Sequence, residues 1–195
     1  ATYGNQPSPQ TVGRENPENS YGFSKYMMDQ IAIRYSNENP KMTIIGLRFF
    51  NVYGPKEYFK AKTSSMVIQL AHQILNGKAP RLFEGSDKIM RDFIYIEDVI
   101  QANIKACTST QNGTFNVGTG NPRSFQEIAD ILQKELGTDL GTEYFPNPFN
   151  DYQMHTQANI KQTQDAFNFD PQFSLEQGIK AYIPEIKCLL NEDIR

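Results

Sequence analysis

NSYGFSKYMMDQIAIRY, residues 19–35, places a tyrosine and a lysine one helical turn apart in a segment that looks like an amphipathic helix. At about 100° per residue, Tyr21 and Lys25 fall on one narrow stripe of that helix. We expect the stripe to face inward, together with Met28, Ala32 and Tyr35. An inward lysine needs an explanation, because removing an unpartnered ammonium from water is costly.

Two explanations of the pair stay open at this stage. Lys25 can bury its stem at the first helical turn and keep its ammonium in water, and the spacing Y-x-x-x-K occurs by chance in many helices. Alternatively, Tyr21 is a general acid and base. The pKa of a phenol, ordinarily about 10, falls by a unit or more when a cation is held within hydrogen-bonding range.

Outward from this helix, predicted strands and helices alternate along the chain. Alternation of this kind predicts an α/β fold. Ser124 and Glu127 form a capping-box pattern at the start of one of the helices. Residues 42–54 are expected to form a buried strand that runs into a loop closed by Gly54-Pro55, and further strands are expected at 80–83, 93–96 and 142–146. The segment 113–137 is expected to form a strand, a turn and a helix. The other expected helices are 20–37, 64–75, one that starts around 97–98, 159–167 and 174–190.

The turn GTGNPR, residues 118–123, begins like the dinucleotide fingerprint G-x-G-x-x-G but has Arg123 in place of the third glycine. We interpret it as an ordinary turn between strand and helix. If the protein uses a nucleotide cofactor, the loop that grips the pyrophosphate is therefore expected to lie outside this chain.

Composition excludes several classes of function. A net charge of −3 gives no broad cationic surface for nucleic acid or an anionic membrane. No apolar run reaches the ~18 residues that a membrane span needs, and no signal peptide is visible, so we expect a cytoplasmic protein. Cys107 and Cys188 lie far apart without metal-like partners, so no metal site is predicted.

Four strings together carry a family resemblance: the helix at 19–35, LRFFNVYGP (47–55), RDFIYIEDV (91–99) and FNVGTG (115–120). In this order they resemble the C-terminal two-thirds of the extended short-chain dehydrogenase/reductase family, the nucleotide-sugar epimerases and dehydratases. Three further strings, NVYGPKEYFKAKTSSM, RLFEGSDKIMRDFIYIEDV and NDYQMHTQANI, are similar to the subfamily that epimerises ADP-glyceromanno-heptose.

The resemblance implies part of a Rossmann-like, doubly wound parallel sheet plus a smaller α/β substrate-binding domain. Residues 1–55 would be the C-terminal part of the dinucleotide-binding domain, whose N-terminal half is missing. Residues 56–195 would be mainly the substrate-binding domain, with the segment 88–110 returning to the Rossmann domain.

The same resemblance implies roles for single residues. Tyr21 would be the acid and base, Lys25 would hold the nicotinamide ribose, and Lys60 would be a second acid/base that also touches the cofactor. Val52 would line the nicotinamide, at the strand end where open α/β sheets bind ligands. The implied substrate contacts are Asn51, Lys62, Gln69, Phe83, Glu84, Gly85, Ser86, Arg91 and Tyr152.

Plainer explanations stay open for several of these residues. Phe83 could simply pack, Glu84 could be a solvated turn residue, and Lys60 could be one charge of a solvated loop. Arg91 could form a structural ion pair with Asp92. Lys62 and Gln69 stand where these epimerases often carry serine and histidine.

The activity implied is conversion of ADP-D-glycero-D-manno-heptose to its L-glycero epimer at C6, in the supply of lipopolysaccharide core precursors. A bound NADP, with NAD as the alternative, would accept and return the hydride, while Tyr21 and, if it is desolvated, Lys60 would move protons on either side of the sugar. The family also implies a homo-oligomer. The alternatives are another enzyme of the family, such as a UDP-hexose 4-epimerase, and an inactive nucleotide-sugar-binding fragment.

Overall fold

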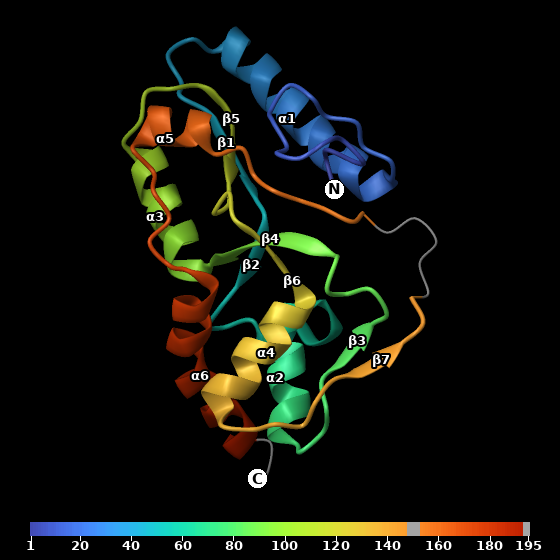
Figure 1. Cartoon of the computed structure of the whole chain (residues 1–195). Coiled ribbons are helices and arrows are strands. Elements are labelled where there is room, and N and C mark those ends of the chain that lie inside the picture. Colours follow the sequence, from blue (N-terminus) through green and yellow to red (C-terminus); the bar gives the residue numbers. More distant parts are fainter. Residues whose placement is uncertain (148–152, 193–195) are drawn as a thin grey trace.

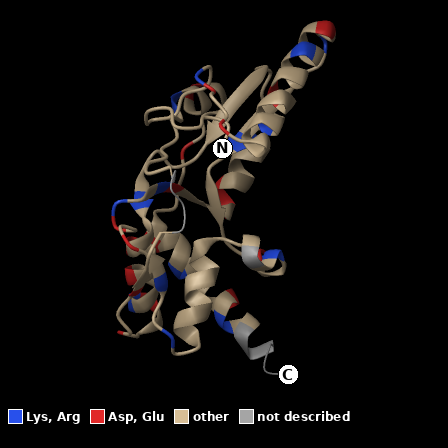
Figure 2. Ribbon diagram, turned by 90° about the vertical axis from the view of Figure 1, so that its right-hand side faces the viewer, with Lys and Arg blue, Asp and Glu red and all other residues tan. Residues whose placement is uncertain are grey.

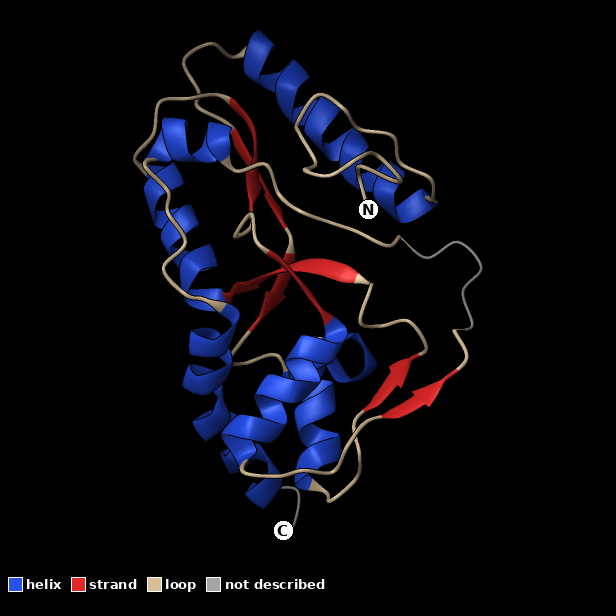
Figure 3. Cartoon of the chain, viewed as in Figure 1, coloured by secondary structure: helices blue, strands red, loops and turns tan. Residues whose placement is uncertain are grey.

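The computed structural model describes residues 1–147 and 153–192, without the side chains of Lys62 and residues 190–192. Helices and strands alternate through it, so the predicted α/β class is confirmed (Figure 1, Figure 3). The helices are α1 (Ser20–Glu38), the 3-10 helix η1 (Tyr58–Thr63), α2 (Met66–Leu75), α3 (Ile96–Cys107), α4 (Phe125–Leu136), α5 (Lys161–Phe167) and α6 (Leu175–Glu192).

The strands pair mostly in parallel. They are β1 (Ile45–Phe49), β2 (Asn51–Tyr53), β3 (Arg81–Phe83), β4 (Met90–Tyr95), β5 (Gly113–Val117), β6 (Pro122–Ser124) and β7 (Glu143–Phe145). The parallel pairs are β1 with β5, β2 with β4, and β3 with β7, whereas β6 runs antiparallel to β4. The described strands therefore form three small sheets: β1 with β5, β2 with β4 and β6, and β3 with β7.

Residues 42–54, expected to be one strand that runs into a loop, form two strands, so this prediction needs a correction. The N–H of Phe50 donates to the carbonyl of Val117 at 2.9 Å and closes the β1–β5 ladder. From Asn51 onward the chain pairs with Phe93 on β4 instead. A change of partner strand leaves no mark in the run of apolar side chains, which is why the sequence shows one segment.

Two hydrophobic clusters hold these sheets and helices together. The larger lies among α2, α4 and α6, with fully buried side chains such as Leu70, Ile128 and Ile179. The smaller lies between the sheets and helices α3 and α5, and includes Val99 and Phe167. Each large buried apolar side chain stabilises the fold by about 1.5–3 kcal/mol relative to an exposed one.

Helix α4 begins as predicted. The hydroxyl of Ser124 accepts a hydrogen bond from the N–H of Glu127, and the Glu127 carboxylate accepts one from the N–H of Ser124. The helix ends at Gly137, whose φ of 70° suits a residue without a Cβ. This capping box fixes where the chain turns from β6 into the helix.

Charged side chains are mixed along the ribbon, with Lys and Arg interspersed among Asp and Glu (Figure 2). In the part of the chain that the structure describes, no helix combines the length and the apolar character needed to cross a bilayer.

Candidate active site

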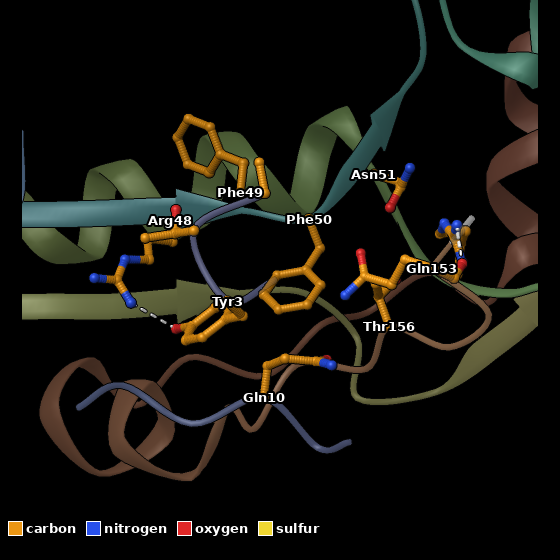
Figure 4. A pocket seen from close by; sticks show the side chains of 11 residues that line it. Tyr3, Gln10, Arg48, Phe49, Phe50, Asn51, Gln153 and Thr156 are labelled. Atoms are coloured by element: carbon orange, nitrogen blue, oxygen red, sulfur yellow. Dashed lines mark hydrogen bonds between the residues drawn. The ribbon is translucent and has the colours of Figure 1, made fainter. Parts of the chain in front are cut away.

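A cavity of about 300 Å³ opens where β1 passes into β2. Its wall comes from four separate parts of the chain: the N-terminal segment, the β1–β2 junction, Arg91 on β4, and the segment after residue 152. Figure 4 shows the Tyr3 and Phe50 rings beside each other, with Arg48 on one side and Asn51, Gln153 and Thr156 on the other. The lining residues are Ala1, Thr2, Tyr3, Gln10, Arg48, Phe49, Phe50, Asn51, Arg91, Gln153 and Thr156.

Two of the predicted substrate contacts, Asn51 and Arg91, line this cavity. Arg91 is buried, and its guanidinium donates to the carbonyl of Met90 at 2.8 Å and to the carbonyl of Gln153. The side-chain amide of Gln153 in turn donates to the carbonyl of Gly4. These bonds fix the Arg91 guanidinium on the cavity wall, and a guanidinium is a group that binds anions.

Asp92, the neighbour of Arg91, is fully buried and organises the turn beside the cavity. Its carboxylate accepts hydrogen bonds from the N–H and hydroxyl of Thr119, and from the N–H groups of Gly120 and Ala158, at 2.6–2.9 Å. The turn read as G-x-G-x-x-R is thus tied to a carboxylate of β4, which fits its interpretation as an ordinary structural turn.

Tyr21 and Lys25 lie together at the start of α1. The side chain of Asn19 accepts from the N–H of Gly22 at 2.8 Å and so begins the helix there. The Lys25 ammonium lies over the Tyr21 ring, 5.5 Å from its centroid. The pair predicted from the spacing therefore forms, with the cation against the phenol.

The predicted inward direction of this stripe is wrong for the described chain. Tyr21 is 63% exposed, and Lys25 and Met28 are also exposed. The side of α1 that packs instead carries Gly22, which is buried, and Asp29, which bonds to Arg48 on β1. This ion pair turns the neighbouring stripe toward the sheet, and α1 is apolar on most of its circumference, so periodicity could not identify the packed side.

Lys60 is exposed on η1 and does not line the cavity. Gln69, half-buried on α2, donates from its amide to the carbonyl of Ser64 at 2.7 Å. Val52 on β2 packs against the smaller hydrophobic cluster. The side chain of Lys62 and the whole of Tyr152 lie outside the described residues.

The predicted loop 83–86 follows β3. The ring of Phe83 packs edge-on against Phe145, with centroids 4.9 Å apart. Glu84 and Gly85 are exposed, and Gly85 has a φ of 80°, which favours glycine. Ser86 is buried, it does not line the cavity, and its hydroxyl has no hydrogen-bond partner among the described residues.

A buried charge network, which the sequence did not predict, forms one side of the cavity. Arg48 bonds to Asp29 at 2.7 Å, to the phenol of Tyr3 at 2.8 Å, and to Glu15. The Arg48 side chain is 11% exposed. Tyr3 donates onward to Asn116 on β5. The network thus joins the N-terminal segment, α1, β1 and β5.

The charges of Arg48 and Glu15 in this network are stabilised in the ionised state. Burial works to lower the pKa of Arg48, but Tyr3, Glu15 and Asp29 together raise it above its ordinary value. Burial works to raise the pKa of Glu15, but hydrogen bonds from Gly13 and Arg48 hold it below its ordinary value. Burial raises the pKa of Tyr3, so at neutral pH its phenol keeps the proton that it donates to Asn116.

Sequence reasoning also missed Gln10, Gln153 and Thr156. Thr156 has a buried hydroxyl on the cavity wall with no partner among the described residues. None of the three belongs to a strand or helix that periodicity could identify. For Gln153 and Thr156 a signal was the string NDYQMHTQANI, in which polar residues cluster without a helical or strand period, whereas Gln10 lies in the N-terminal segment outside that string.

Comparison with known proteins gives consistent matches. The model of the NAD dependent epimerase/dehydratase family matches residues 1–118. The structure of Helicobacter pylori ADP-L-glycero-D-manno-heptose-6-epimerase is 47% identical and superposes with a TM-score of 0.87, covering 95% of this chain and 57% of that one.

Two further solved structures are similar at lower identity. UDP-glucose 4-epimerase of Thermotoga maritima with UDP-glucose gives 25% identity and a TM-score of 0.87, covering 96% of this chain and 60% of that one. UDP-glucuronic acid 4-epimerase of Bacillus cereus with NAD gives 26% and 0.81, covering 96% and 59%. The chain thus spans less than two thirds of the length of each of the three.

Proposed function

Because the chain belongs to the NAD dependent epimerase/dehydratase family, we propose that it is the part of an ADP-glyceromanno-heptose 6-epimerase that supplies the acid/base pair and the substrate pocket. The observations that support the proposal are the Lys25 ammonium over the Tyr21 ring and, separately, a cavity that Asn51 and Arg91 line. Residues 1–55 would complete a dinucleotide-binding domain, and residues 56–195, apart from about 88–110, would bind the substrate.

The residues present fit a nicotinamide cofactor and a nucleotide sugar. Tyr21 and Lys25 are exposed and so accessible to a ligand, and the buried hydroxyls of Thr156 and Ser86 lack a protein partner among the described residues. A bound NADP supplies the group that accepts hydride from the substrate carbon and returns it. In this proposal Tyr21, Lys25, Val52 and Lys60 hold the nicotinamide end, and NADP is preferred to NAD on the family resemblance.

In this proposal, side chains of this chain donate and accept the protons. Tyr21 exchanges a proton with the sugar hydroxyl that becomes a carbonyl and then a hydroxyl again, and Lys25 stabilises its phenolate form. Lys60 serves the other face, because a reaction that returns hydride to the opposite side needs a proton donor there. Arg91 binds the diphosphate, which anchors the remote end of the substrate while the heptose turns.

Replacement of Arg91 by alanine should weaken binding of ADP-heptose about 10–100-fold, because a charge-assisted bond contributes ~1.5–3 kcal/mol. The measurement is calorimetric titration of ADP-heptose. It uses a polypeptide that contains this chain and has the length of the relatives, called the full-length polypeptide below. Arg91→Lys keeps the charge but loses the planar fork, so its loss should be smaller. Lys134→Ala, on the exposed side of α4, is the matched control and should bind as the parent does. Unchanged binding by Arg91→Ala would contradict the anchoring role.

A UDP-hexose 4-epimerase is the second candidate, since the Thermotoga maritima structure has the same TM-score as the Helicobacter pylori one. It would use Tyr21, Lys25 and Asn51 without needing Lys60. Turnover of UDP-glucose in preference to ADP-heptose by the full-length polypeptide would decide for it. A third candidate concerns residues 1–195 on their own: this chain would bind a nucleotide sugar but would not turn it over.

The proposal includes self-association of the protein into a homo-oligomer. It also includes a cytoplasmic location and a role in supplying lipopolysaccharide core precursors. Phe23, Met27 and Ile31 follow one another at four-residue intervals, so they share one side of α1, and all three are exposed. A second copy covering this side would remove their apolar surface from water. Sedimentation of the full-length polypeptide as a monomer at micromolar concentration would contradict the homo-oligomer.

A further inference from the structure

The loop that joins β2 to α2, residues 54–65, carries Lys60 and closes around a buried carboxylate. We propose that this carboxylate, Glu57, is a positioning residue that holds Lys60 where it can act on the substrate. The inference rests on the acid/base role of Lys60 in the proposed function.

Glu57 joins the two ends of the loop. It is 4% exposed, although it lies among exposed neighbours. One carboxylate oxygen accepts from the N–H of Gly54 at 3.3 Å and from the hydroxyl of Ser65 at 2.7 Å. The other accepts from the N–H of Ser65 at 2.7 Å. A single side chain therefore ties the end of β2 to the first turn of α2.

The backbone of Glu57 also holds Lys60 directly. The carbonyl of Glu57 accepts from the N–H of Lys60 at 3.0 Å, and the carbonyl of Lys60 accepts from the hydroxyl of Thr63 at 2.8 Å. The Lys60 side chain itself is exposed. Since its surroundings do not enclose it, the direction in which its ammonium points depends on the loop backbone that Glu57 fixes.

The residue after Lys60 shows why a clamp is needed. Ala61 has φ 48° and ψ −121°, a conformation that residues with a Cβ rarely adopt. Strained residues of this kind persist only where the surrounding structure holds them, and they concentrate at functional sites. Without the Glu57 carboxylate, the loop should relax at Ala61 and carry Lys60 away from its present place.

The test is a double-mutant cycle in the full-length polypeptide with its cofactor bound, followed by NMR of ADP-heptose epimerisation. Glu57→Ala should lower kcat about 10–100-fold, because misplacing an acid/base by about 1 Å has an effect of this size. In a Lys60→Met background the same replacement should change kcat less than about twofold, because no ammonium is left to position. A merely structural Glu57 would lower kcat equally in both backgrounds.

Each outcome is decisive for a different claim. Equal losses in both backgrounds, or parental turnover by Glu57→Ala, would overturn the positioning role. Parental turnover by Lys60→Met would instead overturn the role of Lys60 in the proposed function, and the inference with it. Asp139→Asn removes an exposed carboxylate from the segment after α4 and is the matched control, expected to keep the parental kcat.

Hydrogen exchange keeps the inference testable where turnover is hard to interpret. Glu57→Ala should speed exchange of the Lys60 and Ser65 amides at least tenfold and leave the central amides of α4 unchanged. If Glu57→Ala does not fold, Glu57→Gln, which keeps the side-chain length and one acceptor oxygen, takes its place in the cycle. Unchanged exchange in the loop would contradict the clamp.

Discussion

Replacing Tyr21 by phenylalanine in the full-length polypeptide should lower the kcat for ADP-heptose epimerisation by about 10²–10⁴-fold. The substitution removes one oxygen atom and keeps the ring under the Lys25 ammonium, so α1 and the cation stay in place. Because the phenol acts on the reacting hydroxyl and binds little of the substrate, KM should change much less than kcat. The measurement is NMR of the two epimers at saturating substrate.

Tyr35→Phe is the matched control for this variant. Tyr35 is also a phenol on α1, 49% exposed and near the other end of the helix. Its replacement should leave kcat within about twofold of the parent. If both variants turned over at the parental rate, Tyr21 would not be the acid/base. Lys25 would then simply keep its ammonium in water, and its spacing from Tyr21 would have no catalytic meaning.

Replacing Arg48 by methionine should lower the free energy of unfolding by about 3–5 kcal/mol. The Arg48 guanidinium neutralises Glu15 and Asp29, whose side chains are 10% and 15% exposed, and it also bonds to the phenol of Tyr3. Methionine fills similar space but leaves two carboxylates with little access to water and no cation. Urea unfolding of the full-length polypeptide at pH 7 gives the measurement.

A surface ion pair provides the comparison for Arg48. Arg34 and Glu38 pair at 2.9 Å on α1, with side chains 81% and 56% exposed. Arg34→Met should therefore change the free energy of unfolding by no more than about 0.5 kcal/mol. If both substitutions changed the free energy of unfolding by the same small amount, the Arg48 network would be as well solvated as a surface ion pair. That result would contradict its burial.

The order and type of the main elements were predictable from local pattern. Helices α2 and α4 have a clear apolar side, and the Ser124–Glu127 capping box marks the start of α4 to the residue. Strand β6, Pro122–Ser124, was missed, because three residues after a glycine turn give no period to recognise. What sequence could not supply is the choice of partner strand, which is why the break at Phe50 between β1 and β2 was not expected.

The candidate site also has a part that the sequence predicted and a part that it did not. Tyr21 with Lys25, and Asn51 with Arg91, were identified from motifs, and the structure places each pair together. Tyr3, Gln10 and Gln153 enter the site through hydrogen bonds between segments more than a hundred residues apart, and two of these bonds end on the backbone carbonyls of Gly4 and Gln10. Thr156 is held by its N–H, which donates to the backbone carbonyl of Met90 at 3.0 Å. Any residue type offers a backbone carbonyl, so such contacts leave no signature in the side-chain sequence.

The orientation of α1 was mispredicted for an energetic reason. Its apolar residues are spread around the helix, so burial gives no strong preference for one side. A single ion pair, Asp29 with Arg48, then decides which side meets β1. In such a helix the apolar pattern favours no side, so a helical wheel drawn from the sequence cannot show which side packs.

The most direct test of the whole account is the fate of deuterium at C6 of ADP-heptose during conversion by the full-length polypeptide in ordinary water. Oxidation and re-reduction within one closed site predicts that the product epimer keeps the deuterium at C6, because the hydride that leaves is the hydride that returns. Replacement of the label by solvent hydrogen in step with epimerisation, or no conversion of ADP-heptose at all, would contradict it.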